Sequence, residues 1–213
     1  MKHQNIRAIA HKKLIPILEE IGLRKRKEGI FTKEFEGDFI GWLGLPDVVS
    51  KGVISISPIV AVRSQEVERL RCLFKEKAFH KYIPPHAKIS LGYLLPENSW
   101  REWSFSEESS IHELEDFVEN IKSYALRFME KYSIIELFEE IMASYSGALA
   151  ADQREIYPIV KLVRGDFEGA AEVVNKYCKD IYADTDPRAV SYKNVFAPAI
   201  LNYIDETRTR DGS

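Results

Sequence analysis

Hydrophobic residues recur at helical spacing over residues 7–21, ahead of the first glycine in the chain. The apolar positions of this segment are Ile9, Leu14, Ile17, Leu18 and Ile21. Their spacing of three and four residues is typical of the buried face of an amphipathic helix. Gly22 suits the left-handed position that commonly ends a helix. Pro16 interrupts the pattern, so we expect this helix to be kinked or to start late.

Short apolar runs separated by turn residues follow, and this pattern is typical of strands. The predicted strands cover residues 30–36, 39–45, 53–62, 88–95 and 100–105. Gly37-Asp38 separates the first two runs and predicts a hairpin. Pro58 lacks the N–H that a ladder hydrogen bond needs, so the third run is predicted as an edge or bulged strand. Between the strands, residues 65–77 have helical spacing.

From residue 109 onward the hydrophobic pattern is helical throughout, and we predict five helices there. Several pairs of residues have the spacing of helix caps, in which a side chain satisfies a backbone N–H of the first turn. These pairs are Ser110 with Glu113, Ser133 with Glu136, Asp152 with Glu155, and Asp186 with Pro187. Gly165-Asp166 is predicted to close one helix and open the next.

The order of elements predicts an α+β fold, with a mainly antiparallel sheet packed by helices and an all-helical C-terminal half. We place the α+β sheet region at residues 1–106 and the helical region at residues 107–213. With 213 residues, 45% of them hydrophobic, the chain can bury a substantial core. We therefore expect the helical region to pack on the sheet as one compact domain.

Charge is distributed very unevenly along the chain. Residues 1–33 hold nine Lys/Arg and three acidic residues, a net charge of +6. Residues 97–140 hold twelve acidic residues and four Lys/Arg, a net charge of −8. The formal charge of the whole chain is only −3, so it conceals two opposite local fields. Such fields steer partners toward a protein surface.

The acidic segment centres on a predicted amphipathic helix at residues 110–131. Its acidic residues lie opposite the apolar face or just before the helix. They are Glu107, Glu108, Glu113, Glu115, Asp116, Glu119 and Glu130. One interpretation is an ordinary solvated helix face with acids near its N-terminus, where the helix dipole favours them. The other is a docking surface for a basic partner, such as a nuclease, with association accelerated by electrostatic steering.

Two tryptophans, Trp100 and Trp103, stand just before this helix in the run WREWSF. Aromatic side chains are common binding hot spots when they are exposed. They more often fill the space between a sheet and its helices. We expect at least one of the two tryptophans to lie in the core, and we retain both as candidate partner-binding residues.

The basic segment offers a second candidate surface, in the residues Lys12, Lys13, Arg24, Lys25, Arg26 and Lys27. A basic cluster can hold the phosphate backbone of a nucleic acid. The alternative is that residues 24–27 start a strand whose long charged side chains protect a sheet edge. No aromatic residue is interleaved with this cluster, so we favour edge protection.

Recognisable catalytic and metal-binding motifs are missing from the sequence. No histidine has the spacing of a zinc site, and there is no nucleophile elbow or phosphate-binding glycine loop. We therefore predict a non-catalytic protein without a cofactor or metal. A site assembled from distant residues such as Asp47, His80 and His86 is the enzymatic alternative.

Location and redox state follow from the same composition. No apolar run approaches the length that spans a bilayer, and the N-terminal residues lack the pattern of a signal peptide. We expect a cytoplasmic protein that does not contact membranes. Cys72 and Cys178 are predicted to be buried free thiols, as is usual in a reducing compartment.

Three stretches of the chain resemble a bacterial family called domain of unknown function 4304. They are LIPILEEIGLRKRKEGIFTKEF, WREWSFSEESSIHELEDFVENIKSYALRFMEKYS and RGDFEGAAEVVNKY. The resemblance covers most of the chain and rests on the order of helix, basic stretch, aromatic strand and acidic helix. It implies a relation to immunity proteins of bacterial toxin systems, with a cognate toxin as partner and no catalysis. The leading hypothesis is thus an immunity-type protein, and the alternative is a nucleic-acid-associated accessory protein.

Overall fold

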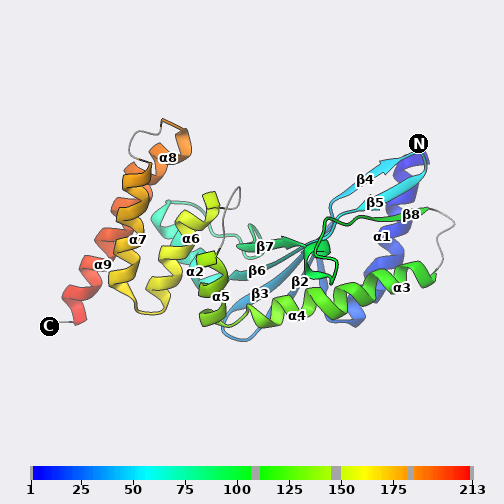
Figure 1. Ribbon diagram of the computed structural model, residues 1–213, viewed down its shortest axis with the longest axis horizontal. Coiled ribbons are helices and arrows are strands. Elements are labelled where there is room, and N and C mark those ends of the chain that lie inside the picture. The colour runs from blue at the N-terminus through cyan, green and yellow to red at the C-terminus, as the bar shows by residue number, and fades with distance from the viewer. Residues whose placement is uncertain (1, 107–110, 145–149, 182–184, 212–213) are drawn as a thin grey trace. The chain divides into compact units, whose positions relative to one another are not determined.

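The computed structural model describes residues 2–106, 111–144, 150–181 and 185–211 (Figure 1). The chain forms two compact units. The sheet unit comprises residues 1–63 and 82–134, and the helical unit comprises residues 64–81 and 135–213. The division by sequence at residue 106 differs from these units, because the chain enters the helical unit twice.

The sheet unit contains two antiparallel sheets and two long helical segments (Figure 1). Its strands are β1 (Arg24–Lys27), β2 (Ile30–Phe35), β3 (Phe39–Gly44), β4 (Asp47–Ser50), β5 (Val53–Ile56), β6 (Ile59–Ser64), β7 (Ala87–Ser90) and β8 (Trp103–Ser106). Its helices are α1 (Lys2–Glu20), the 3₁₀ helix η1 (Leu91–Leu94), α3 (Ile111–Asn120), the π-helix η2 (Ile121–Ala125) and α4 (Leu126–Lys131). The predicted α+β fold with antiparallel sheets is confirmed.

The larger sheet has the strand order β1-β2-β3-β6-β7, and the smaller sheet has the order β4-β5-β8. The pairs β1–β2, β2–β3, β4–β5, β5–β8 and β6–β7 are all antiparallel. The predicted hairpin is confirmed as β2–β3, in which Phe35 is paired with Phe39. Gly37 and Asp38 both have positive φ in its turn, which is the conformation that glycine permits most readily.

Pro58 separates two strands rather than interrupting one. The run that we predicted as a single edge or bulged strand is divided into β5 and β6, which lie in different sheets. That prediction is wrong, since β6 lies between β3 and β7 inside the larger sheet. Pro58 stands at the crossing between the sheets, where its missing N–H breaks no ladder bond. Its carbonyl accepts a hydrogen bond from the Leu91 N–H at 2.9 Å.

A single helical segment, α3–η2–α4, packs on both sheets. On the small sheet, the ring of Phe117 lies 5.3 Å from that of Trp103 and 5.5 Å from that of Phe105. On the large sheet, Met129 lies so close to Gly41 that a Cβ on this glycine would be 2.7 Å from the methionine sulfur. The predicted apolar face of the helix is therefore buried, and it unites the two sheets in one core.

Helix α1 runs without interruption from Lys2 to Glu20, with Pro16 inside it. The late start that we considered does not occur. Leu14 and Leu18 are fully buried, which confirms the apolar face. Gly22, with a φ of +86°, ends the helix as predicted.

The helical unit is built from α2 (Gln65–Phe74), α5 (Ile135–Ser144), α6 (Ala150–Val163), α7 (Phe167–Asp180), α8 (Pro187–Ser191), the π-helix η4 (Tyr192–Phe196) and α9 (Ala197–Asp211). The predicted helical C-terminal half is confirmed (Figure 1). The ring of Phe74 on α2 packs edge-on against Phe196 and Tyr203, at centroid distances of 6.1 and 5.4 Å.

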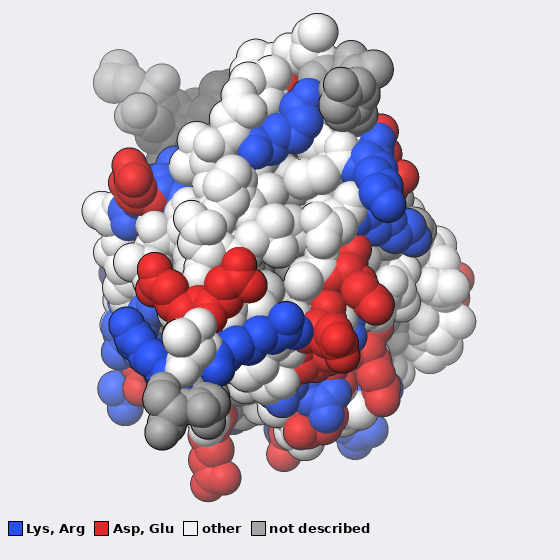
Figure 2. Space-filling model, turned by 90° about the vertical axis from the view of Figure 1, so that its left-hand side faces the viewer, with Lys and Arg blue, Asp and Glu red and all other residues white. Residues whose placement is uncertain are grey.

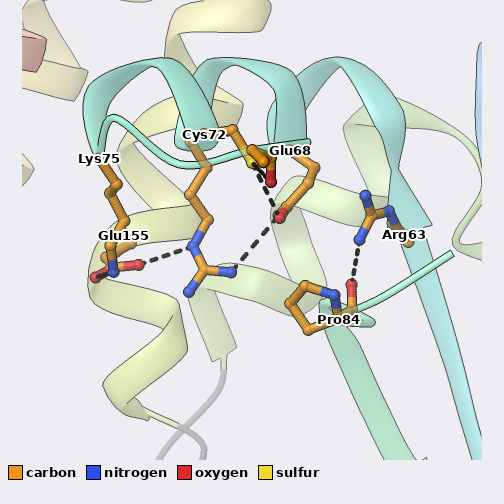
Figure 3. Close-up of polar contacts among 8 residues, drawn as sticks. Arg63, Glu68, Cys72, Lys75, Pro84 and Glu155 are labelled. Carbon is orange, nitrogen blue, oxygen red and sulfur yellow. Dashed lines mark hydrogen bonds and ion pairs between the residues drawn. The ribbon is translucent and has the colours of Figure 1, made fainter. Parts of the chain in front are cut away.

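Ion pairs between α2 and α6 accompany this aromatic contact (Figure 3). Arg71 donates from Nε to the Glu155 carboxylate at 2.7 Å, and Lys75 also pairs with that carboxylate. The Glu155 side chain is only 14% exposed, so these charges are partly removed from water. Glu155 on α6 thus pairs with two cations of α2. These pairs link α2 to the rest of the helical unit, although α2 lies far from that unit's other helices in the sequence.

Two predicted helix caps are confirmed and two are wrong. Asp166 accepts from the Gly169 N–H at 2.9 Å, and Asp186 accepts from the Arg188 N–H at 2.8 Å. The Ser133 hydroxyl instead donates to the Met129 carbonyl, which satisfies the preceding helix. Asp152 lies inside α6, because that helix begins at Ala150. The Ser110 pair falls partly outside the described residues.

We expect Phe117→Ala to lower the free energy of unfolding by about 3–5 kcal/mol, because it leaves a cavity between the helix and the small sheet. Urea denaturation followed by circular dichroism measures this change. Lys122→Ala is the matched control on the same segment, since Lys122 is exposed and its replacement should change stability by less than about 0.5 kcal/mol. Equal losses in both variants would contradict the proposed packing role.

The surroundings of Asp166 predict that the free energy of unfolding depends on pH. The hydrogen bond from Lys161, and then the bond from the Gly169 N–H, lower the pKa of the Asp166 carboxyl in the folded state. A lowered pKa stabilises the fold above the ordinary pKa of aspartate, and this stabilisation is lost as the pH falls through the folded-state pKa.

We therefore expect Asp166→Ala to cost about 0.5–2 kcal/mol at neutral pH, and less in acid. Denaturant titrations at neutral pH and at about pH 3 measure the difference. Asp166→Asn is the control, because asparagine keeps the cap but loses the charge facing Lys161. A loss that is equally large at both pH values would exclude the charged carboxylate as its source.

Candidate protein-binding surface

The two candidate tryptophans have different surroundings. The side chain of Trp103 points into the core on β8 and is 6% exposed, against Phe117. It therefore does not contribute a side chain to a binding surface, which corrects its assignment as a partner-binding residue. Trp100, three residues earlier, is 58% exposed. The expectation that one tryptophan fills the core is confirmed.

The loop that carries Trp100 folds back on the 3₁₀ helix η1. The Ser99 N–H donates to the Gly92 carbonyl at 3.3 Å, and the Asn98 N–H donates to the Leu95 carbonyl at 2.9 Å. A Cβ at Gly92 would lie 2.3 Å from the Ser99 oxygen, so only glycine allows this approach. The loop therefore holds Trp100 on a fixed backbone.

Tyr93 is an exposed aromatic residue that the sequence analysis missed. It follows Gly92 directly and is 46% exposed. We had predicted residues 88–95 as one strand, but β7 ends at Ser90 and η1 begins at Leu91. The glycine inside the apolar run KISLGYLL was the available signal, because an isolated glycine often marks the end of regular strand structure.

The 3₁₀ helix η1, which carries Tyr93, packs against η2, the π-helix that continues α3. Glu115, Asp116 and Glu119 are exposed on α3, just ahead of this contact, as their helical positions predicted. Glu119 accepts a hydrogen bond from the Ser123 hydroxyl at 2.9 Å and lies 3.9 Å from the Lys122 ammonium. The side chain of Glu113, as well as Glu107 and Glu108, lies outside the described residues.

We call Tyr93, Trp100, Glu115, Asp116 and Glu119 the acidic–aromatic surface. It combines two exposed aromatic side chains with three exposed carboxylates, and η1 packs against η2, which follows the α3 carboxylates on the same helical segment. Exposed aromatic residues are enriched at the centres of protein interfaces, and charged residues at their rims.

The structure divides the acidic segment between the two units. Glu136, Glu139 and Glu140 belong to α5 of the helical unit. Glu139 lies 3.2 Å from the Lys161 ammonium and also pairs with Arg164, which in turn lies 3.9 Å from Glu136. These partners neutralise part of the −8 charge. Figure 2 likewise shows Lys/Arg beside Asp/Glu on the face formed by the C-terminal helices.

The basic residues of the alternative hypothesis lie in the sheet unit, on α1 and on the edge strand β1. Arg24, Lys25 and Lys27 are exposed, whereas Arg26 donates to the Thr32 hydroxyl at 2.7 Å and stacks over the Tyr82 ring. Lys12 is exposed and Lys13 is half-buried on α1. A lysine- and arginine-rich edge strand fits the edge-protection interpretation.

The residues of the enzymatic alternative have separate surroundings. Asp47 accepts a hydrogen bond from Arg7 in the sheet unit, at 2.6 Å. His86 is buried in that unit, where its backbone N–H donates to the Val62 carbonyl, and His80 is exposed in the helical unit. Among the described residues, no three His, Cys, Asp or Glu side chains are grouped as metal ligands. Cys72 is buried and Cys178 half-buried, and they form no disulfide.

Within the described ranges, none of the helices combines the length and the apolar character needed to cross a membrane. No family model matches the chain, and no curated protein or solved structure matches it either. The resemblance to the bacterial family of domain 4304 therefore stays a prediction.

The different surroundings of the tryptophans predict their fluorescence quenching. The chain has three tryptophans, and Trp42 and Trp103 are only 9% and 6% exposed. We expect Trp100→Phe to remove most of the fluorescence that acrylamide quenches in the native protein. Trp103→Phe is the control and should leave the quenchable fraction nearly unchanged. Strong quenching that persists in Trp100→Phe would contradict the exposed position of Trp100.

Proposed function

We propose that the protein is a non-catalytic binding protein that holds a basic protein partner on its acidic–aromatic surface. The observation that carries this proposal is the exposed Trp100 in a loop hydrogen-bonded to η1, which in turn packs against the helical segment that displays the exposed acids. We further propose, from the family resemblance, that the partner is a cognate bacterial toxin and that binding neutralises it. A basic nuclease is the toxin class that the charges favour.

The aromatic and acidic residues have different roles in this proposal. A tryptophan side chain presents about 150–250 Å² of area, and its burial at an interface slows dissociation. The loop is already fixed by hydrogen bonds from the Ser99 and Asn98 N–H groups. Little conformational entropy of the loop is therefore lost when a partner covers Trp100. The carboxylates of α3 act over a longer range and raise the association rate of a basic partner.

A nuclease is a suitable partner because its substrate-binding surface must attract phosphates with Lys and Arg side chains. Exposed carboxylates on a helix offer those side chains an alternative set of anionic ligands. A protein bound there occludes the nucleic acid without any chemistry of its own. The proposed mechanism of neutralisation is therefore steric and electrostatic competition with the substrate.

The test begins by isolating the partner on the tagged full-length protein in its native cell and purifying that partner. Surface plasmon resonance then measures its binding to variants. We expect Glu115→Lys with Asp116→Lys to slow association by about tenfold and to flatten its salt dependence. We expect Trp100→Ala to accelerate dissociation by about tenfold or more. Glu140→Lys, at an exposed acid of the helical unit, is the matched control.

Binding that is unchanged both in Glu115→Lys with Asp116→Lys and in Trp100→Ala would contradict the proposed surface. A partner whose toxicity and enzymatic activity persist in the complex would contradict neutralisation. Retention of nucleic acid in place of a protein would support the alternative function. That retention should fall steeply with salt, and it should decrease further in Lys25→Gln with Lys27→Gln, which leaves the acidic–aromatic surface intact.

A further inference from the structure

A cleft of about 490 Å³ opens on the sheet unit at a place that the proposed function does not use. Its walls come from α1, the turn between β1 and β2, the end of β3, the start of β4 and the first residue of β6. Sites for small molecules in proteins commonly measure about 300–1,000 Å³. The cleft shares no residue with the acidic–aromatic surface.

Apolar side chains line part of the cleft. Its lining includes Trp42, Leu45 and Ile59. The Trp42 ring lies over Gly44, two residues further along β3. A Cβ at Gly44 would lie 2.4 Å from the tryptophan ring, so glycine is required for this ring position. The indole N–H of Trp42 is buried and has no hydrogen-bond acceptor in the described part of the chain. Trp42 and Leu45 are only 9% and 2% exposed, so the half-exposed side chains of Ile30 and Ile59 are among the apolar groups that a ligand can cover.

Charged groups of both signs surround the apolar part. Arg7 donates from Nε to the Asp47 carboxylate at 2.6 Å, and the two charges largely neutralise each other. Lys27 and Glu28 are exposed on the turn and line the same cleft. Neither forms an ion pair with another described residue. The Glu28 carboxylate does act on the Arg7 guanidinium, whose pKa it helps Asp47 to raise. The cleft therefore presents the Lys27 ammonium and, beside Arg7, the exposed Glu28 carboxylate to a ligand.

We infer that this cleft binds a small zwitterion with an apolar body, of the class of hydrophobic α-amino acids. The ligand carboxylate faces Lys27 and the Arg7 guanidinium, and the ligand ammonium faces Glu28. Its apolar body covers the half-exposed side chains of Ile30 and Ile59, where removal from water stabilises the complex. A polyanion such as a nucleotide is disfavoured, because Glu28 and Asp47 repel it. An uncharged apolar ligand leaves the Lys27 ammonium without a partner.

Isothermal titration calorimetry on the full-length protein tests this inference with defined probes. L-Phenylalanine is the zwitterion, N-acetyl-L-phenylalanine lacks the ammonium, and L-phenylalaninamide lacks the carboxylate. We expect L-phenylalanine to bind and each blocked derivative to bind about tenfold more weakly, since each loses one charge-assisted contact.

Variants then test which protein charge contacts each end of the ligand. Glu28→Gln should weaken L-phenylalanine about tenfold but leave N-acetyl-L-phenylalanine unchanged. Lys27→Met should weaken L-phenylalanine similarly but leave L-phenylalaninamide unchanged. Lys25→Met, on the same strand but outside the cleft, is the matched control. Both substituted cleft residues are exposed, so folding should be preserved, and thermal unfolding of each variant verifies this.

Three results would overturn the inference. The first is the absence of binding by both L-phenylalanine and L-leucine at about 10 mM, a concentration that detects even weak sites. The second is equal binding of the zwitterion and the two blocked derivatives. The third is equal weakening by the cleft variants and by Lys25→Met.

Discussion

Phe117 packs against Trp103 and Phe105 on the small sheet, while Met129 on the same helical segment packs against Gly41 on the large sheet. These contacts make two sheets share one core, although the chain crosses between them at Pro58 without a ladder bond. The three-stranded sheet would have little apolar support by itself, because small sheets depend on a packed face for stability. The outer side of this helical segment is consequently held in place and displays Glu115, Asp116 and Glu119.

The two proposed sites use different kinds of chemistry on the same unit. The acidic–aromatic surface displays side chains outward from a helix and a short loop, which suits a large partner. The cleft is a hollow lined by charged groups of both signs and by isoleucine side chains, which suits a small one. Because no residue belongs to both, either function can be present without the other.

Charged residues of both segments form ion pairs with residues that are distant in the sequence. The −8 segment is continuous along the chain, but Glu136 and Glu139 meet Arg164 and Lys161 in the helical unit. Likewise, Arg7 of the +6 segment meets Asp47. A local count of charges cannot include such partners, since they come from positions distant in sequence. The exposed carboxylates of α3 are the part of the acidic segment that keeps its predicted position on the surface.

The sequence by itself determined the features that depend on near neighbours. Alternation and turn residues specified the β2–β3 hairpin, helical spacing specified the acidic face of α3, and local hydrogen bonds specified the caps at Asp166 and Asp186. Tertiary structure alone decided that Trp103 is buried while Trp100 is exposed, and that Pro58 marks a crossing between sheets. It also assembled the cleft, whose walls come from segments far apart in the chain. The physical reason is that burial depends on which distant element covers a residue, and periodicity along the chain does not specify that partner.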